Sequence, residues 1–285
     1  MVFETYRIAS GFFGDKLYQQ RAREALPVLV RQAKAATPIY YEDLASEMGM
    51  SNPRNLNYPL GCIGDALNEL SKEWGRDIPH IQAIVRNRQT DLPGPGFDGF
   101  LEQQGHSWSS AQERRALIQT YWAAIANYPY WDQVLADLGL EPTSVSLDAT
   151  IAAASNLGVG GEGEEHKALK EYVRDNPFVV GLGYGTAKGV AEFPLPSGDK
   201  IDVLFNREHL IFAVEVKPAH SSEADLTRGL FQCVKYQAVL VAKARYDHDR
   251  REIKVCLLLG GELPEKLIPL RNLLDVQVFE SIRPE

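Results

Sequence analysis

Hydrophobic positions recur at helical spacing over much of the first half of the chain. Apolar side chains fall three and four residues apart in residues 16–36 and again in residues 111–127, so both segments are predicted to be amphipathic helices. The stretch 88–98 between them, RQTDLPGPGFD, has the Pro and Gly content of loops and turns. The first half is therefore expected to be mainly helical.

Short apolar runs rich in β-branched residues become common in the second half, and they alternate with helical patterns. Helices are predicted at Glu164–Asp175, from Ala224 to about Arg245, and near Glu262–Leu274. The predicted strands are Phe178–Tyr184, Val190–Leu195, Lys200–Phe205, Leu210–Val216, Glu252–Leu259 and Val276–Phe279. The order α-β-β-β-β-α-β, with an α-β addition, predicts a sheet with flanking helices of the α/β or α+β class.

The change of pattern coincides with a segment of small residues that closes on Gly-Val-Gly-Gly-Glu-Gly. Such a run does not hold a regular helix or strand, so it is predicted to separate two domains. We expect a mainly helical N-terminal domain in residues 1–134, a linker in residues 135–161, and a second domain in residues 162–285.

The composition is that of an ordinary globular protein, with 45% hydrophobic and 24% charged residues. No apolar run approaches the roughly 20 residues that span a bilayer, and the first residues lack the layout of a signal peptide. We therefore expect a cytoplasmic protein without a membrane partner. Cys62, Cys233 and Cys256 are scattered and form no CxxC pair, which argues against a disulfide framework and a thiolate zinc site.

The net charge of −8 counts against a nucleic-acid partner, because most DNA-binding domains are basic. A metal-dependent nuclease must nevertheless gather carboxylates, and net charge does not describe local patches. DNA therefore stays among the expected partners.

Charged residues interrupt two of the predicted strands. Asp202 lies within one, while Glu215 and Lys217, two positions apart on the next, point to the same side. If the short loop 206–209 pairs these strands, Asp202 and Glu215 lie side by side, and a divalent cation between them would offset the cost of burying both. Mg²⁺ or Mn²⁺ suits such oxygen ligands. The alternative is a set of salt bridges at a strand end.

An acid on one strand, a short hairpin and then Glu215-Val216-Lys217 on the next resemble the PD-(D/E)XK nuclease superfamily, over about residues 162–280. The resemblance implies a restriction-endonuclease-like α-β-β-β-α-β core and metal-dependent hydrolysis of DNA. Asp202 and Glu215 would hold the metal ion, and Lys217 would position or deprotonate the attacking water. Lys200-Ile201 stands where the family formula has a Pro before the first acid.

Two further features fit the resemblance. The family often places a metal-site glutamate on the first core helix, and Glu162 and Glu165 are both candidates here. Some branches carry Gln-x-x-x-Tyr on the helix after the second strand, which Gln232 and Tyr236 match on one helical face.

Other residues of the same region are weaker candidates. Arg228 and Lys235 on the long helix could reach a DNA phosphate, and a solvated helix face is the alternative. His166 is expected to pack on its helix rather than bind a metal, His220 to be an ordinary loop residue, and Cys233 to be a small buried hydrophobic residue.

Residues 38–105 are loosely similar to the winged-helix DNA-binding domain of the alkylguanine-DNA alkyltransferases. The reactive Pro-Cys-His-Arg of that family is replaced by Pro79-His80-Ile81-Gln82, so no thiolate is present for alkyl transfer. The resemblance implies DNA docking, with Arg54, Asn55 and Asn57 near the start of a recognition helix. A small helical domain for dimerisation or packing is the alternative.

Together these features predict a two-domain, Mg²⁺-dependent deoxyribonuclease, and the resemblance implies a setting in restriction or anti-phage defence. The alternative is a catalytically inert DNA-binding or scaffold protein that retains the nuclease fold. The sequence has no GxxxxGKS, GxSxG or HExxH motif that would indicate another enzyme class. It leaves open single- or double-stranded substrate, and whether the chain acts as a homodimer or with a defence-system partner protein.

Overall fold

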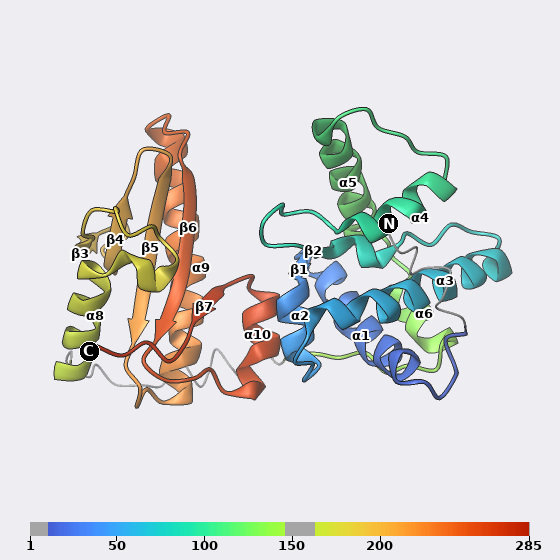
Figure 1. Cartoon of the computed structure of the whole chain (residues 1–285), viewed down its shortest axis with the longest axis horizontal. Coiled ribbons are helices and arrows are strands. Elements are labelled where there is room, and N and C mark those ends of the chain that lie inside the picture. The colour runs from blue at the N-terminus through green and yellow to red at the C-terminus, as the bar shows by residue number, and fades with distance from the viewer. Residues whose placement is uncertain (1–10, 146–162, 285) are drawn as a thin grey trace. The chain divides into compact units, whose positions relative to one another are not determined.

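The computed structural model describes residues 11–145 and 163–284. The chain divides into two compact units, residues 1–145 and 146–285 (Figure 1). Helices dominate the first unit, and the second contains a mixed five-stranded sheet, so the chain as a whole belongs to the mixed α+β class. Glu162 lies outside the described residues.

The N-terminal unit is built on long helices. The predicted helices at 16–36 and 111–127 are confirmed as α1 (Leu17–Lys34) and α5 (Ala111–Ala126). The remaining elements of this unit are β1 (Ile39–Tyr40), α2 (Tyr41–Glu47), η2 (Pro53–Leu56), α3 (Asn57–Trp74), η3 (Ile81–Ile84), β2 (Val85–Arg86), η4 (Pro95–Phe97), α4 (Asp98–Gln103) and α6 (Trp131–Asp137).

Apolar side chains from α1, α3 and α6 close the core of this unit, among them Leu26, Leu29, Ile63, Leu67 and Trp131, all of them fully buried. The two short strands β1 and β2 pair in parallel, with Ile39 opposite Val85. The expected loop 88–98 begins with an isolated antiparallel bridge between Leu92 and the preceding Asn87, and the chain then enters η4.

The linker predicted at residues 135–161 was placed too early in the chain. Residue Leu135 lies inside α6, and both Leu135 and Leu138 are buried in the N-terminal core. Their apolar side chains continue the helical face of Trp131 and Val134, so the helix extends to Asp137.

The second unit follows the predicted order closely. It contains α8 (Glu164–Asp175), η5 (Pro177–Val180), β3 (Val190–Pro194), β4 (Lys200–Asn206), β5 (Leu210–Lys217), α9 (Glu223–Tyr246), β6 (Glu252–Leu259), η6 (Glu265–Leu267), α10 (Ile268–Leu273) and β7 (Gln277–Phe279). The sheet order is β3-β4-β5-β6-β7, antiparallel from β3 to β5 and parallel from β5 to β7.

Two apolar clusters hold helices on this sheet. Leu169 and Val173 of α8 pack with Val203, Val214 and Val216. A second cluster joins α9 to the sheet and contains Leu195, Ile201, Leu204, Ala213, Tyr236 and Leu240. Because Ala213 and Val214 are adjacent on β5 and face opposite sides, α8 and α9 cover opposite faces of the sheet.

The prediction of a strand at Phe178–Tyr184 is wrong. Pro177 opens the 3-10 turn η5, and Gly181 ends it with a left-handed backbone (φ 75°). Proline removes an N–H donor and glycine favours this conformation, so the segment turns. Its apolar character reflects the burial of Val180 and Leu182.

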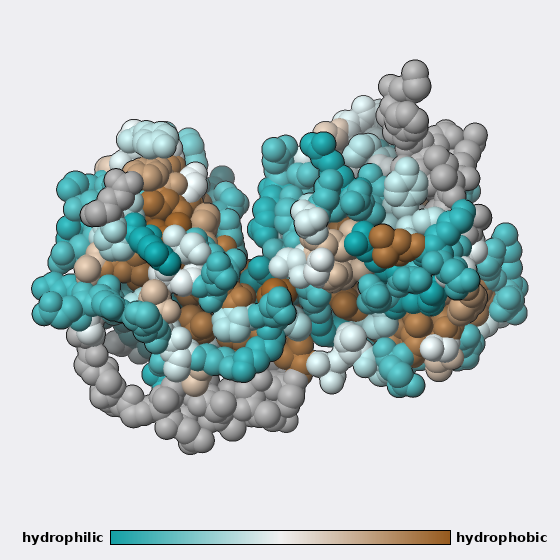
Figure 2. Space-filling view, turned by 60° about the horizontal axis from the view of Figure 1, so that its bottom comes forward, coloured by the Kyte–Doolittle hydropathy of each residue, from teal (hydrophilic) through white to brown (hydrophobic). Residues whose placement is uncertain are grey.

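Hydrophilic residues cover much of the surface of each unit in the view of Figure 2. Among the helices of the described residues, none is both long enough and apolar enough to cross a membrane.

Candidate active site

Asp202 of β4 and Glu215 of β5 lie at the end of the antiparallel pairing between these two strands. The last pair of the ladder is Val203 with Val214, and Asp202 and Glu215 are the next residue on each strand. The backbone N–H of Val216 donates to Oδ2 of Asp202 at 2.8 Å, which fixes this carboxylate against β5. Both residues are buried, with exposed fractions of 8% for Asp202 and 3% for Glu215.

Burial of two neighbouring carboxylates is electrostatically costly. Desolvation, and then the negative charge of Asp202, raise the pKa of Glu215 to about 7, while Lys217 acts in the opposite direction. The pair therefore accumulates more negative charge than its surroundings readily accommodate, which is the condition a bound cation would relieve.

Lys217 lies on the same side of β5 as Glu215, at the end of the strand. Its Nζ donates to Oε1 of Glu215 at 2.6 Å and to Oε1 of Gln232 at 3.1 Å. Glycine at position 229 of α9 leaves room for this side chain, because a Cβ there would lie 3.0 Å from Cε of Lys217 and 2.9 Å from Cδ1 of Leu257. The lysine is therefore confined by α9 as well as by its own strand.

Gln232 and Tyr236 connect Lys217 to the backbone of β4. Nε2 of Gln232 donates to the Tyr236 hydroxyl at 3.3 Å, and that hydroxyl donates to the carbonyl of Lys200 at 3.1 Å. Burial raises the pKa of Tyr236 well above its ordinary value, which keeps the hydroxyl neutral and able to donate. The structure thus joins the predicted Gln-x-x-x-Tyr pair to Lys217 in one chain of hydrogen bonds.

His166 of α8 also contacts the site, although we expected it from the sequence to pack on its helix. Its Nε2 lies 3.3 Å from Oδ2 of Asp202, and this contact raises the pKa of the imidazole. The available signal was its helical position: His166 precedes Leu169 and Val173 by three and seven residues, on the buried face of α8. Lys170, one turn further on, is buried and forms an ion pair with Glu192 of β3.

Glu165 is exposed on α8, next to His166 in the sequence. Within residues 11–145 and 163–284, no three or more His, Cys, Asp or Glu side chains form a group that could hold a metal ion. Mg²⁺, however, is commonly held by one or two carboxylates while water and substrate oxygens complete its coordination. The buried, mutually repelling carboxylates of Asp202 and Glu215 fit such an ion.

The remaining candidates of the second unit lie on α9 and in the turn before it. Arg228 is half-buried on α9, and the exposed Lys235 forms an ion pair with Asp199 at 2.7 Å. Cys233 is buried, as expected, and burial raises the pKa of its thiol. His220 is exposed in the turn between β5 and α9.

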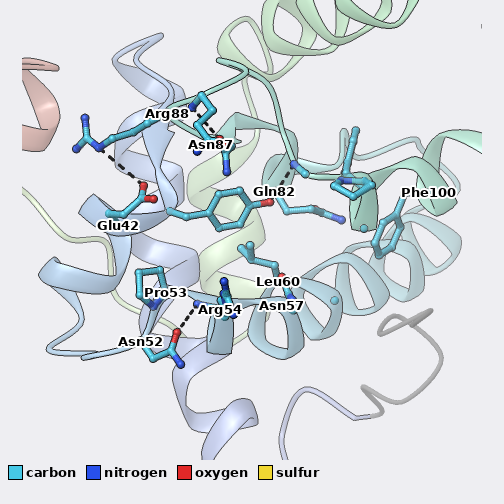
Figure 3. A pocket seen from close by; sticks show the side chains of 17 residues that line it. Glu42, Asn52, Pro53, Arg54, Asn57, Leu60, Gln82, Asn87, Arg88 and Phe100 are labelled. Atoms are coloured by element: carbon cyan, nitrogen blue, oxygen red, sulfur yellow. Dashed lines mark hydrogen bonds and ion pairs between the residues drawn. The ribbon is translucent and has the colours of Figure 1, made fainter. Parts of the chain in front are cut away.

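The N-terminal candidates lie where α3 begins. Arg54 and Asn55 belong to η2, Asn57 is the first residue of α3, and all three are exposed. Arg54 and Asn57 line a pocket of about 800 Å³ within this unit (Figure 3). This pocket was not predicted, because its lining comes from separate segments between Tyr41 and Phe100.

Comparison of the chain with protein-family models, with curated proteins and with solved structures gave no match. Any statement about function therefore depends on the chemistry of the site itself.

Proposed function

We propose that this chain is an endonuclease that hydrolyses DNA phosphodiester bonds with the help of Mg²⁺, for which Mn²⁺ can substitute. The observation that carries the proposal is the pair of buried carboxylates, Asp202 and Glu215, with Lys217 held 2.6 Å from Glu215. An acid on one strand and Glu-x-Lys on its neighbour are the hallmark of the PD-(D/E)XK nucleases.

The order of elements supports the same assignment. From α8 through β3, β4, β5 and α9 to β6 the chain runs α-β-β-β-α-β, the order of a restriction-endonuclease-like core. The extra strand predicted at Phe178–Tyr184, which made the sequence depart from that order, is not formed, and the 3-10 turn η5 overlaps its first residues.

Asp202 and Glu215 would hold the metal ion. When bound, a divalent cation lowers the pKa of a coordinated water and polarises a phosphate oxygen. Lys217 would hold the attacking water and stabilise the negative charge that develops on the phosphate. Gln232 would keep the ammonium group of Lys217 in place, and Tyr236 would orient Gln232.

His166 would act on Asp202. Its imidazole contacts one carboxylate oxygen, Oδ2, which also accepts from the backbone of Val216. These two contacts fix the carboxylate, so that its other oxygen can turn to a cation. Arg228 and Lys235 on α9, and Arg54, Asn55 and Asn57 of the N-terminal unit, would contact the DNA.

Supercoiled plasmid and circular single-stranded DNA, each incubated with Mg²⁺, Mn²⁺ or EDTA, test this proposal. Asp202→Asn keeps the size of the side chain but removes its charge, and Lys217→Ala removes the ammonium group. Glu208→Gln is the matched control, because this carboxylate lies exposed in the loop between the same two strands.

We expect cleavage that requires the metal ion, is lost in Asp202→Asn and Lys217→Ala, and is retained in Glu208→Gln. Cleavage that persists in EDTA, or in both site variants, would contradict the proposal. Absence of cleavage together with absence of Mg²⁺ binding by calorimetry would favour an inert DNA-binding protein instead.

A further inference from the structure

The pocket of the N-terminal unit has the size of a small-molecule site. Its volume of about 800 Å³ falls within the range of about 300 to 1,000 Å³ that such sites occupy. Four stretches of chain supply its lining: α2, the η2–α3 region, the segment from η3 to the loop after β2, and the segment from Gly94 to Phe100.

One wall is suited to an anion. Arg54 and Asn57 lie on the same side of the pocket in Figure 3, at the N-terminal end of α3. This helix has 18 residues and no acidic residue in its first turn, so the positive end of its dipole is not offset there. The guanidinium of Arg54 adds a full positive charge that can donate two hydrogen bonds to a phosphate.

The opposite wall carries Arg88 and Glu42 (Figure 3). The Arg88 guanidinium donates to both carboxylate oxygens of Asp43 at 2.7 Å and lies 4.3 Å from the centre of the Tyr40 ring. Its charge is therefore largely balanced. The pocket thus has an electrostatic direction, with an anion favoured at Arg54 and not at Glu42.

The third part of the pocket combines an amide with apolar rings. Gln82 is 4% exposed, and its Oε1 accepts no hydrogen bond from the described residues. Its Nε2 lies 3.4 Å from Nδ1 of His80. Phe97 and Phe100 also line the pocket, with ring planes 28° apart and ring centres 6.1 Å apart.

The buried carbonyl oxygen of Gln82 accepts no hydrogen bond from the described residues, so a ligand group that donates to it gains a hydrogen bond. The position of this amide also depends on Gly64 of α3. A Cβ at that residue would lie 2.4 Å from Nε2 of Gln82 and 2.5 Å from Cε1 of Phe100, so any larger side chain displaces both.

We propose that this pocket binds one nucleotide, with its base at Gln82 and the phenylalanines and its phosphate at Arg54. A base edge presents the paired donor and acceptor groups that a glutamine amide matches, and a base is flat enough to lie against apolar rings. A nucleotide also carries the anion that the start of α3 favours. The inference goes beyond nuclease activity and does not depend on the metal site.

Two sources present this chemistry: a free mononucleotide, or an unpaired nucleotide of a strand. Binding is measured on the full chain in EDTA, so that cleavage plays no part. The ligands are the four deoxynucleoside monophosphates, followed by calorimetry, and a fluorescent single strand, its duplex, and that duplex with one unpaired base, followed by polarisation.

The variants are Arg54→Ala, Gly64→Ala and Lys72→Ala. The first removes an exposed side chain, so folding is not at stake, and the second displaces Gln82 and Phe100. The third is a matched control, because Lys72 is an exposed cation at the far end of the same helix.

We expect saturable binding that Arg54→Ala and Gly64→Ala each weaken about tenfold or more, and that Lys72→Ala changes less than about twofold. Tight binding of a mononucleotide identifies a free nucleotide as the ligand. Preference for the single strand or the unpaired base over the continuous duplex identifies a nucleotide within a strand. No binding of any ligand, or binding that neither pocket variant weakens, overturns the inference.

Discussion

Acidification should destabilise the N-terminal unit through a single buried imidazole. His80 is 2% exposed and packs against Phe100, with ring centres 4.9 Å apart. Burial lowers its pKa from 6.5 to about 4, since desolvation penalises the charged ring. Between these two pH values the unfolded chain binds the proton and the folded chain does not, so the free energy of unfolding falls as the pH falls.

The magnitude follows from the same two values. Each tenfold change in proton affinity is worth about 1.4 kcal/mol, so moving the pKa from 6.5 to about 4 corresponds to about 3 kcal/mol. This stability is fully present above pH 6.5, declines below it, and is lost by about pH 4. For a domain whose total stability is on the order of 5–15 kcal/mol, that loss is large.

Tryptophan fluorescence isolates the unit that contains this residue. All four tryptophans, Trp74, Trp108, Trp122 and Trp131, belong to the N-terminal unit, so urea unfolding followed by their emission reports on it alone. His80→Gln removes the titration, so the difference in stability between this variant and the wild type at each pH isolates the contribution of this imidazole from those of other titrating groups.

The control is His106→Gln, which removes an exposed histidine of the same unit. We expect this control to keep the pH dependence of the wild type. The free energy of unfolding of His80→Gln, relative to that of the wild type, should rise by about 3 kcal/mol as the pH falls from 7 to 4. Parallel loss of stability in the wild type and in His80→Gln would refute the reasoning.

Three further predictions concern the second unit. Glu215, whose pKa is raised to about 7, binds a proton in the folded state between pH 4.5 and 7, so its contribution to stability is lost as the pH rises through this range. In EDTA, the free energy of unfolding of Glu215→Gln, relative to that of the wild type, should therefore rise by about 3 kcal/mol between pH 4.5 and 8. Urea unfolding followed by far-ultraviolet circular dichroism measures this difference, and an equal pH dependence in the two proteins would contradict the prediction. Gly229→Ala should destabilise the unit by about 1–3 kcal/mol and slow cleavage, because the new methyl group displaces Lys217; unchanged cleavage kinetics would show that α9 does not confine this side chain. Tyr236→Phe should cost about 1 kcal/mol of stability and lower the cleavage rate without changing the Mg²⁺ requirement, and a variant as active and stable as the wild type would remove Tyr236 from the site.

Most elements of the second unit were predictable, because their signals are local. The apolar positions of α8 and α9 repeat at helical spacing, and β4 and β5 are joined by a loop too short to allow any other pairing. Asp202 and Glu215 therefore had to approach each other once the register was set. The strand predicted from Phe178 was wrong because apolar residues of this run are buried in a turn.

The rest of the site depends on packing between segments far apart in the sequence. His166 reaches Asp202 across 36 residues, and nothing near His166 in the sequence indicates that contact. The N-terminal pocket is harder still, because Gln82, Arg54 and Phe100 come together only after α3 and the loops around it have packed. The local sequence around each of these residues does not indicate a pocket.

Nicking of supercoiled plasmid in Mg²⁺ tests the central claim most directly, with Lys217→Met compared with the wild type. Lys254→Met is the control, because Lys254 is a half-exposed lysine on the neighbouring strand β6, paired with Glu252. The account predicts that Lys217→Met lowers the nicking rate by about 10²- to 10⁴-fold and that Lys254→Met leaves it unchanged. No nicking is expected in EDTA. Nicking by Lys217→Met at the wild-type rate, or nicking without metal, would contradict it.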